Sequence, residues 1–234
     1  MRTHAQTAGV SLTAQQPEVN IVRTALEALA AVLGGTQSLH TNSFDEALAL
    51  PTEDAVRLAL RTQQVIAHET GVTATADPLG GSYYVEHLTN ELERQAYEYF
   101  ERIEALGGVI EAIKKNFFQA EIADASFRHQ REVELGERVI VGVNRFEMDD
   151  AVPAELHRVD PESESRQVAR LRAMRADRDG QAVEAALAHL RAEAAGEGNL
   201  MGPIVDAARS DVTMGEMCDA LREVWGVWRE TPVF

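Results

Sequence analysis

The segment over residues 34–50, GGTQSLHTNSFDEALAL, constrains the fold more than any other part of the chain. Two glycines end a helical pattern, and a short strand is predicted over residues 36–40. The turn after this strand leads into a predicted helix, which Ser43 and Glu46 would open as a capping box. Side chains able to hydrogen-bond a ligand gather where the strand ends: His40, Thr41, Asn42 and Glu46. An α/β barrel presents reactive side chains in this way, at the C-terminal ends of its strands.

The first 71 residues have the order strand, helix, strand, helix. A polar alternating strand is predicted over 3–8, an amphipathic helix over 19–33, the strand over 36–40, and a helix over 53–70. This order is typical of a barrel segment. Two strands cannot close a barrel, so we expect the barrel to be incomplete in this chain.

The sequence after residue 71 predicts mostly helix. The expected elements are a turn over 77–82, an extended run over 83–85, helices over 89–106, 109–116 and 119–134, and a strand over 139–143. A charged segment with prolines follows, and a second capping box, Thr213 to Glu216, precedes the last helix. The expected regions are a barrel segment with its flanking helices over 1–148, a linker or surface strap over 149–165, and a C-terminal helical region over 166–234.

Composition restricts the classes of partner. The chain carries 38 acidic against 22 basic residues, a formal net charge of −16. Nucleic-acid binding needs a basic patch, so no nucleic-acid partner is expected. No apolar run approaches the roughly 18 residues that a membrane span needs, and a single cysteine, Cys218, suits a reducing compartment. We therefore expect a cytoplasmic protein without membrane contact.

Two pairs of polar side chains are candidates for ligand contacts. Asn42 and Glu46 are spaced about one helical turn apart, which suits the hydroxyl pair of a ribose. As residues alone, however, they are more readily interpreted as a turn and a helix cap. His4 and Gln6 share one strand face by the period of two. A lone histidine on a strand is as often a satisfied core residue, and that alternative stays open for His4.

Long stretches of the chain carry a family resemblance. They are RTHAQTAGVSLTAQQPEVNIVRTALEALAAVLGGTQSLHTNSFDEALALPT at residues 2–52, ADPLGGSYYVEHLT at 76–89 and VIVGVNRF at 139–146. These segments resemble the adenosylcobalamin-dependent acyl-CoA mutases, the methylmalonyl-CoA mutase family. The resemblance implies the C-terminal part of the large catalytic subunit. The implied fold class is mostly helical α/β: the last part of a TIM (β/α)8 barrel followed by a helical extension.

The resemblance also implies a binding site for adenosylcobalamin (coenzyme B12). Asn42 and Glu46 would hydrogen-bond the ribose of the adenosyl group, and Gln6 would reach the cobalamin where Gly9 leaves room. Ala49 and Leu50 would contact the corrin edge, and His4 would line the cavity beneath the corrin. The residues that match the family's cofactor positions are Gln6, Gly9, Asn42, Glu46, Ala49, Leu50 and His4.

The cobalt ligand is expected to come from another domain or subunit. The family's cobalt-binding signature, Asp-x-His-x-x-Gly, does not occur in this chain, so His40 is not interpreted as the ligand. The remaining histidines lack the spacing of metal ligands. No metal site is therefore predicted.

By resemblance the complete enzyme is an isomerase, an intramolecular transferase that rearranges the carbon skeleton of an acyl-CoA by a radical mechanism. The groups that act on the substrate, and the CoA tunnel, belong to the earlier half of the family's barrel. No catalytic residue is therefore expected in this segment, and the isolated chain is expected to be inactive. The implied partners are the acyl-CoA substrate, a separate cobalamin-binding small subunit, the N-terminal half of the barrel and further copies in an oligomer.

Two other functions stay open at this point. The chain could be a non-catalytic binding or assembly module that docks a cobalamin-binding subunit. It could also be a helical scaffold that has lost the ancestral chemistry. Replacing Asn42 and Glu46 by alanine tests the second alternative, because a scaffold would show no effect on cobalamin binding.

Overall fold

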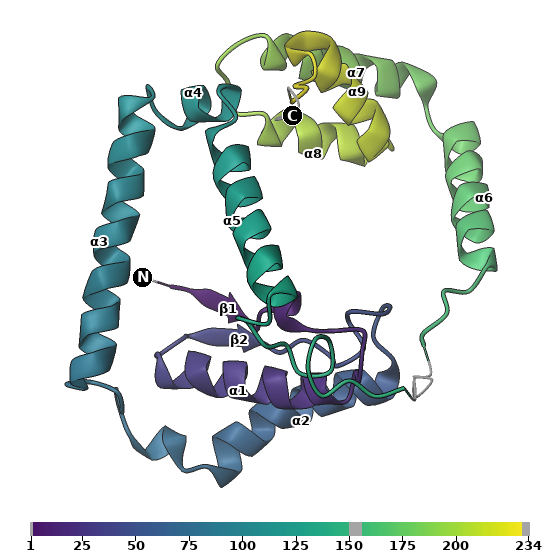
Figure 1. Ribbon diagram of the computed structural model, residues 1–234. Helices are drawn as coiled ribbons and strands as arrows, with labels where there is room; N and C mark the ends of the chain where they lie inside the picture. Colours follow the sequence, from purple (N-terminus) through teal and green to yellow (C-terminus); the bar gives the residue numbers. More distant parts are fainter. Residues whose placement is uncertain (1, 150–155, 231–234) are drawn as a thin grey trace. The chain divides into compact units, whose positions relative to one another are not determined.

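Figure 1 shows the computed structural model of the chain, which describes residues 2–149 and 156–230. The chain divides into two compact units, the first reaching Arg158 and the second beginning at Val159. Residues 150–155 of the predicted linker lie outside the described residues, and the end of that linker already belongs to helix α6. The described chain is mostly helical with few strands, as the predicted class requires.

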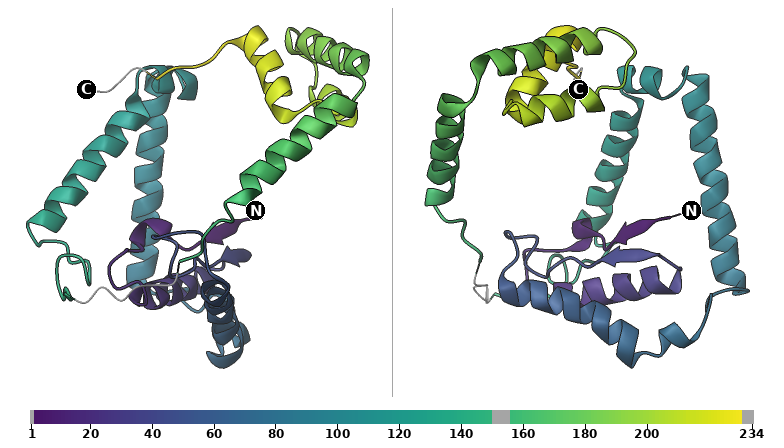
Figure 2. Two further views of the ribbon diagram at one scale, coloured as in Figure 1. Left: turned by 90° about the vertical axis from the view of Figure 1, so that its right-hand side faces the viewer. Right: turned by 180° about the vertical axis from the view of Figure 1, so that it is seen from behind.

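Two short parallel strands organise the first unit. β1 (His4–Gln6) pairs with β2 (Ser38–His40), with His4 opposite Ser38 and Gln6 opposite His40. α1 (Val19–Leu33) connects the strands and α2 (Glu53–Glu69) follows β2, and both helices cover one side of the two strands (Figures 1 and 2). The predicted order of strand, helix, strand and helix is confirmed. Both strands are shorter than predicted.

Local sequence signals place the ends of the two helices. α1 ends at Leu33, and Gly35 two residues later has a φ of +78°, a left-handed conformation that favours glycine. α2 begins after Thr52, whose hydroxyl oxygen accepts a hydrogen bond from the backbone N–H of Ala55 at 3.3 Å. Both helices therefore lie within about one residue of the predicted bounds, and they pack against each other.

A buried asparagine ties α1 to two loops. The side chain of Asn20 has no exposed surface. Its Nδ2 donates to the carbonyl oxygens of Thr13 at 2.9 Å and Phe44 at 2.8 Å. Its Oδ1 accepts from the backbone N–H of Thr13 at 3.1 Å and from Arg23 Nη1 at 2.7 Å. Because all its hydrogen-bonding positions are used, this side chain fixes both loops without leaving a buried polar group unpaired.

The prediction that a helix begins at Ser43 is wrong. Residues 44–50 form turns instead, in which the backbone N–H groups of Leu48 and Ala49 both donate to the carbonyl oxygen of Asp45. The Asp45 carboxylate also accepts from the backbone N–H of Thr52 at 2.9 Å. This contact closes a compact turn. A longer helix through this segment is also disfavoured because Pro51 has no backbone N–H to donate.

Two predicted extended segments also differ from the structure. Residues 83–85 begin α3 (Tyr83–Ala105), because the apolar positions after them continue back to Tyr84 at helical spacing. Residues 139–143 form no strand in the described chain, and Val141 makes only an isolated bridge to Arg145. A strand requires a neighbour to complete its hydrogen bonds, and this segment instead turns back on itself.

Within the described part of the first unit, three more helices follow α2. α3 is followed by α4 (Val109–Lys114) and α5 (Phe117–Glu134). This part of the unit also contains two short 3-10 helices, η1 (Gly9–Ser11) after β1 and η2 (Val72–Ala74) after α2. The guanidinium of Arg102 on α3 lies over the rings of both Tyr99 and Phe117 and pairs with Glu121 of α5. Within the described residues, no helix is both long and apolar enough to cross a membrane.

The second unit is a helical cluster with its own core. Its helices are α6 (Glu162–Asp177), α7 (Gly180–Ala194), α8 (Met201–Arg209) and α9 (Met214–Trp225). α7, α8 and α9 enclose buried apolar side chains: Val183, Leu187, Leu190, Ala207, Val212 and Ala220. The capping box predicted at Thr213 and Glu216 is confirmed.

An ion pair supports that capping box. Arg178 donates from its two terminal nitrogens to both carboxylate oxygens of Glu216, at 2.7 and 2.6 Å. This hydrogen bonding, together with the backbone N–H of Thr213, holds the pKa of Glu216 well below its usual range. The charged carboxylate therefore stabilises the fold at neutral pH, and this stabilisation is lost as the pH falls below about 4.

We expect Glu216→Gln to destabilise the second unit by about 1–2 kcal/mol at pH 7, because it removes the ion pair and weakens the cap. The difference in unfolding free energy between wild type and Glu216→Gln should shrink as the pH falls from about 5 to about 2. Both tryptophans lie in this unit, and Trp225 Nε1 donates to the carbonyl oxygen of Ala194 at 2.9 Å, so tryptophan fluorescence during urea unfolding measures it. Glu184→Gln on α7, whose side chain is exposed, is the control. Equal stability of Glu216→Gln and wild type at pH 7 would contradict this prediction.

Candidate functional site

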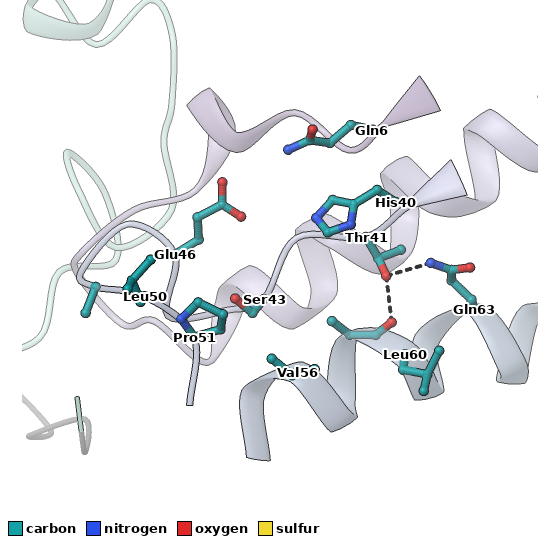
Figure 3. Close-up of a pocket in the computed structure, with 12 residues that line it drawn as sticks. Gln6, His40, Thr41, Ser43, Glu46, Leu50, Pro51, Val56, Leu60 and Gln63 are labelled. Atoms are coloured by element: carbon teal, nitrogen blue, oxygen red, sulfur yellow. Dashed lines mark hydrogen bonds between the residues drawn. The ribbon is translucent and has the colours of Figure 1, made fainter. Parts of the chain in front are cut away.

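A pocket of about 710 Å³ lies where β1 and β2 end, between the turn over residues 43–51 and α2 (Figure 3). One part of its lining is polar and comes from both strands, the turn and α2. The polar residues are Gln6, His40, Thr41, Ser43, Glu46 and Gln63. The apolar part is formed by Ala49, Leu50 and Pro51 of the turn and by Val56, Ala59 and Leu60 of α2.

The strand register places two of these side chains together. Gln6 and His40 are directly opposite each other in the β1–β2 pair, so both project to the same face of the sheet. Figure 3 shows them with Glu46 around one space. His4 shares that face, but its Nδ1 lies 2.8 Å from Ser38 Oγ and it does not line the pocket. The structure therefore separates His4 from the other polar candidates.

Asn42 does not line the pocket but contacts Gln6, which does. It is 1% exposed, and its backbone N–H donates to Thr7 Oγ1 at 2.9 Å. Its side-chain Oδ1 accepts from Gln6 Nε2 at 3.0 Å. Its Nδ2 has no hydrogen-bond partner among the described residues. A buried donor without a partner costs about 1–3 kcal/mol, which is characteristic of a site completed by a further group.

Asn42 and Glu46 approach the backbone of Gly9 closely, and we call this close approach the Gly9 notch. A Cβ atom at this position would lie 2.9 Å from Asn42 Nδ2 and 3.1 Å from Glu46 Oε1. Any side chain here would therefore displace the two groups that sequence analysis singled out. This contact brings Gly9 together with Asn42 and Glu46, which follow it by more than 30 residues in the sequence.

Hydrogen bonds hold α2 against the end of β2. Thr41 Oγ1 donates to the carbonyl oxygen of Ala59 at 2.7 Å. Gln63 Nε2 donates to Thr41 Oγ1 at 3.0 Å and to the carbonyl oxygen of Leu39 at 3.1 Å. Sequence reasoning missed the wall that α2 supplies. Its signal is the spacing of Val56, Leu60 and Gln63, which places all three on one face of the helix.

The chemistry of the pocket follows from its two walls. Glu46 is the one carboxylate in its described lining, and amide, imidazole and hydroxyl groups surround it. The opposite wall offers apolar surface. Such a pocket suits a ligand with a hydroxylated polar part and a broad apolar part. No group of three or more metal-ligating side chains occurs within residues 2–149 and 156–230.

The predicted site residues therefore occupy three kinds of position. Four line the pocket: Gln6, Glu46, Ala49 and Leu50. Asn42 and Gly9 adjoin the pocket, through the hydrogen bond to Gln6 and through the notch. His4 is outside it. Their roles towards a ligand remain predictions.

Comparison with known proteins identifies the family. The family model described as "Methylmalonyl-CoA mutase" matches residues 1–227. The chain belongs to the methylmalonyl-CoA mutase family. This result confirms the resemblance of the sequence motifs.

Individual relatives extend over nearly all of this chain but are much longer. The 2-hydroxyisobutanoyl-CoA mutase large subunit of Aquincola tertiaricarbonis is 48% identical over 100% of this chain and 42% of the relative. The methylmalonyl-CoA mutase of Rhizobium meliloti is 49% identical over 99% of this chain and 33% of the relative. The mitochondrial human methylmalonyl-CoA mutase is 44% identical over 97% of this chain and 30% of the relative. The chain thus spans less than half the length of these relatives.

We expect Gly9→Ala to disturb the site while preserving the fold. The new Cβ would push into Asn42 Nδ2, and the buried Asn42 has little room to move. The hydrogen bond between Gln6 and Asn42 should weaken, which a shift of the Asn42 side-chain amide signals in NMR spectra would report. Gly202→Ala on α8, where a Cβ meets nothing within 4 Å, is the control. Unchanged Asn42 signals in Gly9→Ala would contradict the proposed crowding.

Proposed function

We propose that this chain is part of an adenosylcobalamin-dependent acyl-CoA mutase and contributes the face that holds the adenosyl group and the corrin. The observation that carries the proposal is the buried Asn42 Nδ2, which has no partner among the described residues, next to Glu46 at the Gly9 notch. The family is generally B12-dependent, and this chain belongs to it. The relatives named above are mutases by name.

The residues fit the cofactor. The Glu46 carboxylate would accept hydrogen bonds from the ribose hydroxyl pair, and Asn42 Nδ2 would donate to the same sugar. Gln6, by donating to Asn42 Oδ1, orients that amide towards the notch. Ala49 and Leu50 would contact the corrin edge and exclude water from it. When bound, adenosylcobalamin supplies the radical chemistry that rearranges the carbon skeleton of the acyl-CoA.

The remaining parts of the enzyme would come from outside this chain. β1 and β2 each pair on one side only within the described residues, whereas parallel sheets are normally extended and buried on both faces. We propose that the earlier part of a TIM barrel completes this sheet and brings the groups that act on the acyl-CoA. The cobalt ligand would come from a cobalamin-binding domain or small subunit. The isolated chain would then be inactive.

We expect the double variant Asn42→Ala/Glu46→Ala to weaken adenosylcobalamin binding at least tenfold, because it removes the hydrogen bonds to the ribose. The measurement is a titration of the complex reconstituted from this chain, the rest of the barrel and the cobalamin-binding subunit. His68→Ala, on the exposed last turn of α2, is the control. If the double variant binds and turns over the cofactor as the wild type does, the assignment is wrong. Full binding without turnover of any acyl-CoA would favour a non-catalytic docking module instead.

A further inference from the structure

A buried carboxylate lies next to the pocket but does not line it. Asp45 precedes Glu46 in the sequence and is 1% exposed. Its Oδ2 accepts hydrogen bonds from the backbone N–H of Thr52 at 2.9 Å and from Thr52 Oγ1 at 3.1 Å. Its Oδ1 has no partner among the described residues. Burying a half-satisfied carboxylate is costly, so its position calls for an explanation beyond packing.

The two hydrogen bonds from Thr52 join the ends of the pocket's turn. Asp45 is at the beginning of this turn and Thr52 at its end, directly before α2. Between them lie the pocket residues Glu46, Ala49 and Leu50. The contact therefore closes the turn that carries Glu46.

The backbone and the neighbouring helices reinforce this contact. The carbonyl oxygen of Asp45 accepts from the backbone N–H groups of Leu48 at 2.9 Å and Ala49 at 3.1 Å. From the side of α1, Asn20 Nδ2 holds the carbonyl oxygen of Phe44 at 2.8 Å. At the other end, Thr52 is the N-cap of α2. The turn is thus attached to α1 at one end and to α2 at the other.

We infer that Asp45 is the positioning residue of this site, which holds the turn so that Glu46 faces the Gly9 notch in the absence of ligand. The inference rests on the proposed function for the identity of the ligand, but not for the contact itself. A preorganised turn loses less conformational freedom when the ligand binds, so the site binds the ligand more tightly than it would with a flexible turn. Asp45 acts through Glu46 and does not itself touch the ligand.

The first experiment follows hydrogen exchange of the full chain without ligand. In Asp45→Ala the backbone amides of Leu48, Ala49 and Thr52 should exchange at least tenfold faster, whereas those of α7 should not change. Asp45→Asn keeps an oxygen that can accept from Thr52, so it should restore part of the protection. Unchanged exchange at all three amides in Asp45→Ala would overturn the inference.

A matched control separates this contact from a general charge effect. Asp54 lies in the first turn of α2, the helix that Thr52 caps. Its side chain is exposed and pairs with Arg57. Asp54→Asn removes a carboxylate near the same helix end without touching the turn. It should leave the exchange of Leu48, Ala49 and Thr52 as in the wild type. Faster exchange in this variant, equal to that of Asp45→Ala, would overturn the inference.

The second experiment uses adenosylcobalamin as the probe, titrated into the reconstituted complex. Asp45→Ala should weaken binding at least fivefold at a temperature far below unfolding. Because Asp45 acts through Glu46, adding Asp45→Ala to Glu46→Ala should cost little more than Glu46→Ala alone. A merely structural role would give additive losses, and additive losses would overturn the inference. If wild type binds no adenosylcobalamin, the proposed function fails, and the exchange experiment still decides the role of Asp45.

Discussion

The parallel pairing of β1 with β2 is the constraint on which the rest of the first unit depends. The pairing places Gln6 opposite His40 and makes both strands end at the same edge. The chain leaving β1 therefore passes Gly9, and the chain leaving β2 passes Asn42, within a few ångströms of each other. Parallel strands in α/β folds bind ligands at this edge because loops from different strands converge there.

Several side chains buried around that edge are polar, whereas protein cores are usually held together by apolar packing. Asn20 and Thr41 have hydrogen-bond partners and fix the loops to α1 and α2. Asn42 and Asp45 each retain an atom without a partner among the described residues. In a stable fold such departures concentrate at functional sites, where a later partner offsets their cost. Of these two, Asn42 Nδ2 faces the proposed ligand, whereas Asp45 holds the turn through its hydrogen bonds with Thr52.

Sequence reasoning succeeded where local signals decide the structure. The apolar spacing of residues 19–33 and the N-cap Thr52 predicted α1 and the start of α2. It failed at the turn after Ser43, because the Asp45–Thr52 contact overrides the capping pattern, and at residues 139–143, which lack a pairing strand in the described chain. Six of the seven residues that the family motifs indicated line or adjoin the pocket, whereas His4 lies outside it. The wall from α2 depends on how the helix packs, which residue spacing alone leaves open.

The central claim is that the strand-end pocket holds adenosylcobalamin, and hydrogen exchange with and without the cofactor tests it most directly. In the reconstituted complex, added adenosylcobalamin should slow exchange of the backbone amides over residues 42–50. Exchange over α7, which lies in the second compact unit, should not change. Protection confined to the segment 42–50 and its neighbours would support the account. Tight cofactor binding that leaves residues 42–50 unprotected would contradict it, because the site would then lie elsewhere.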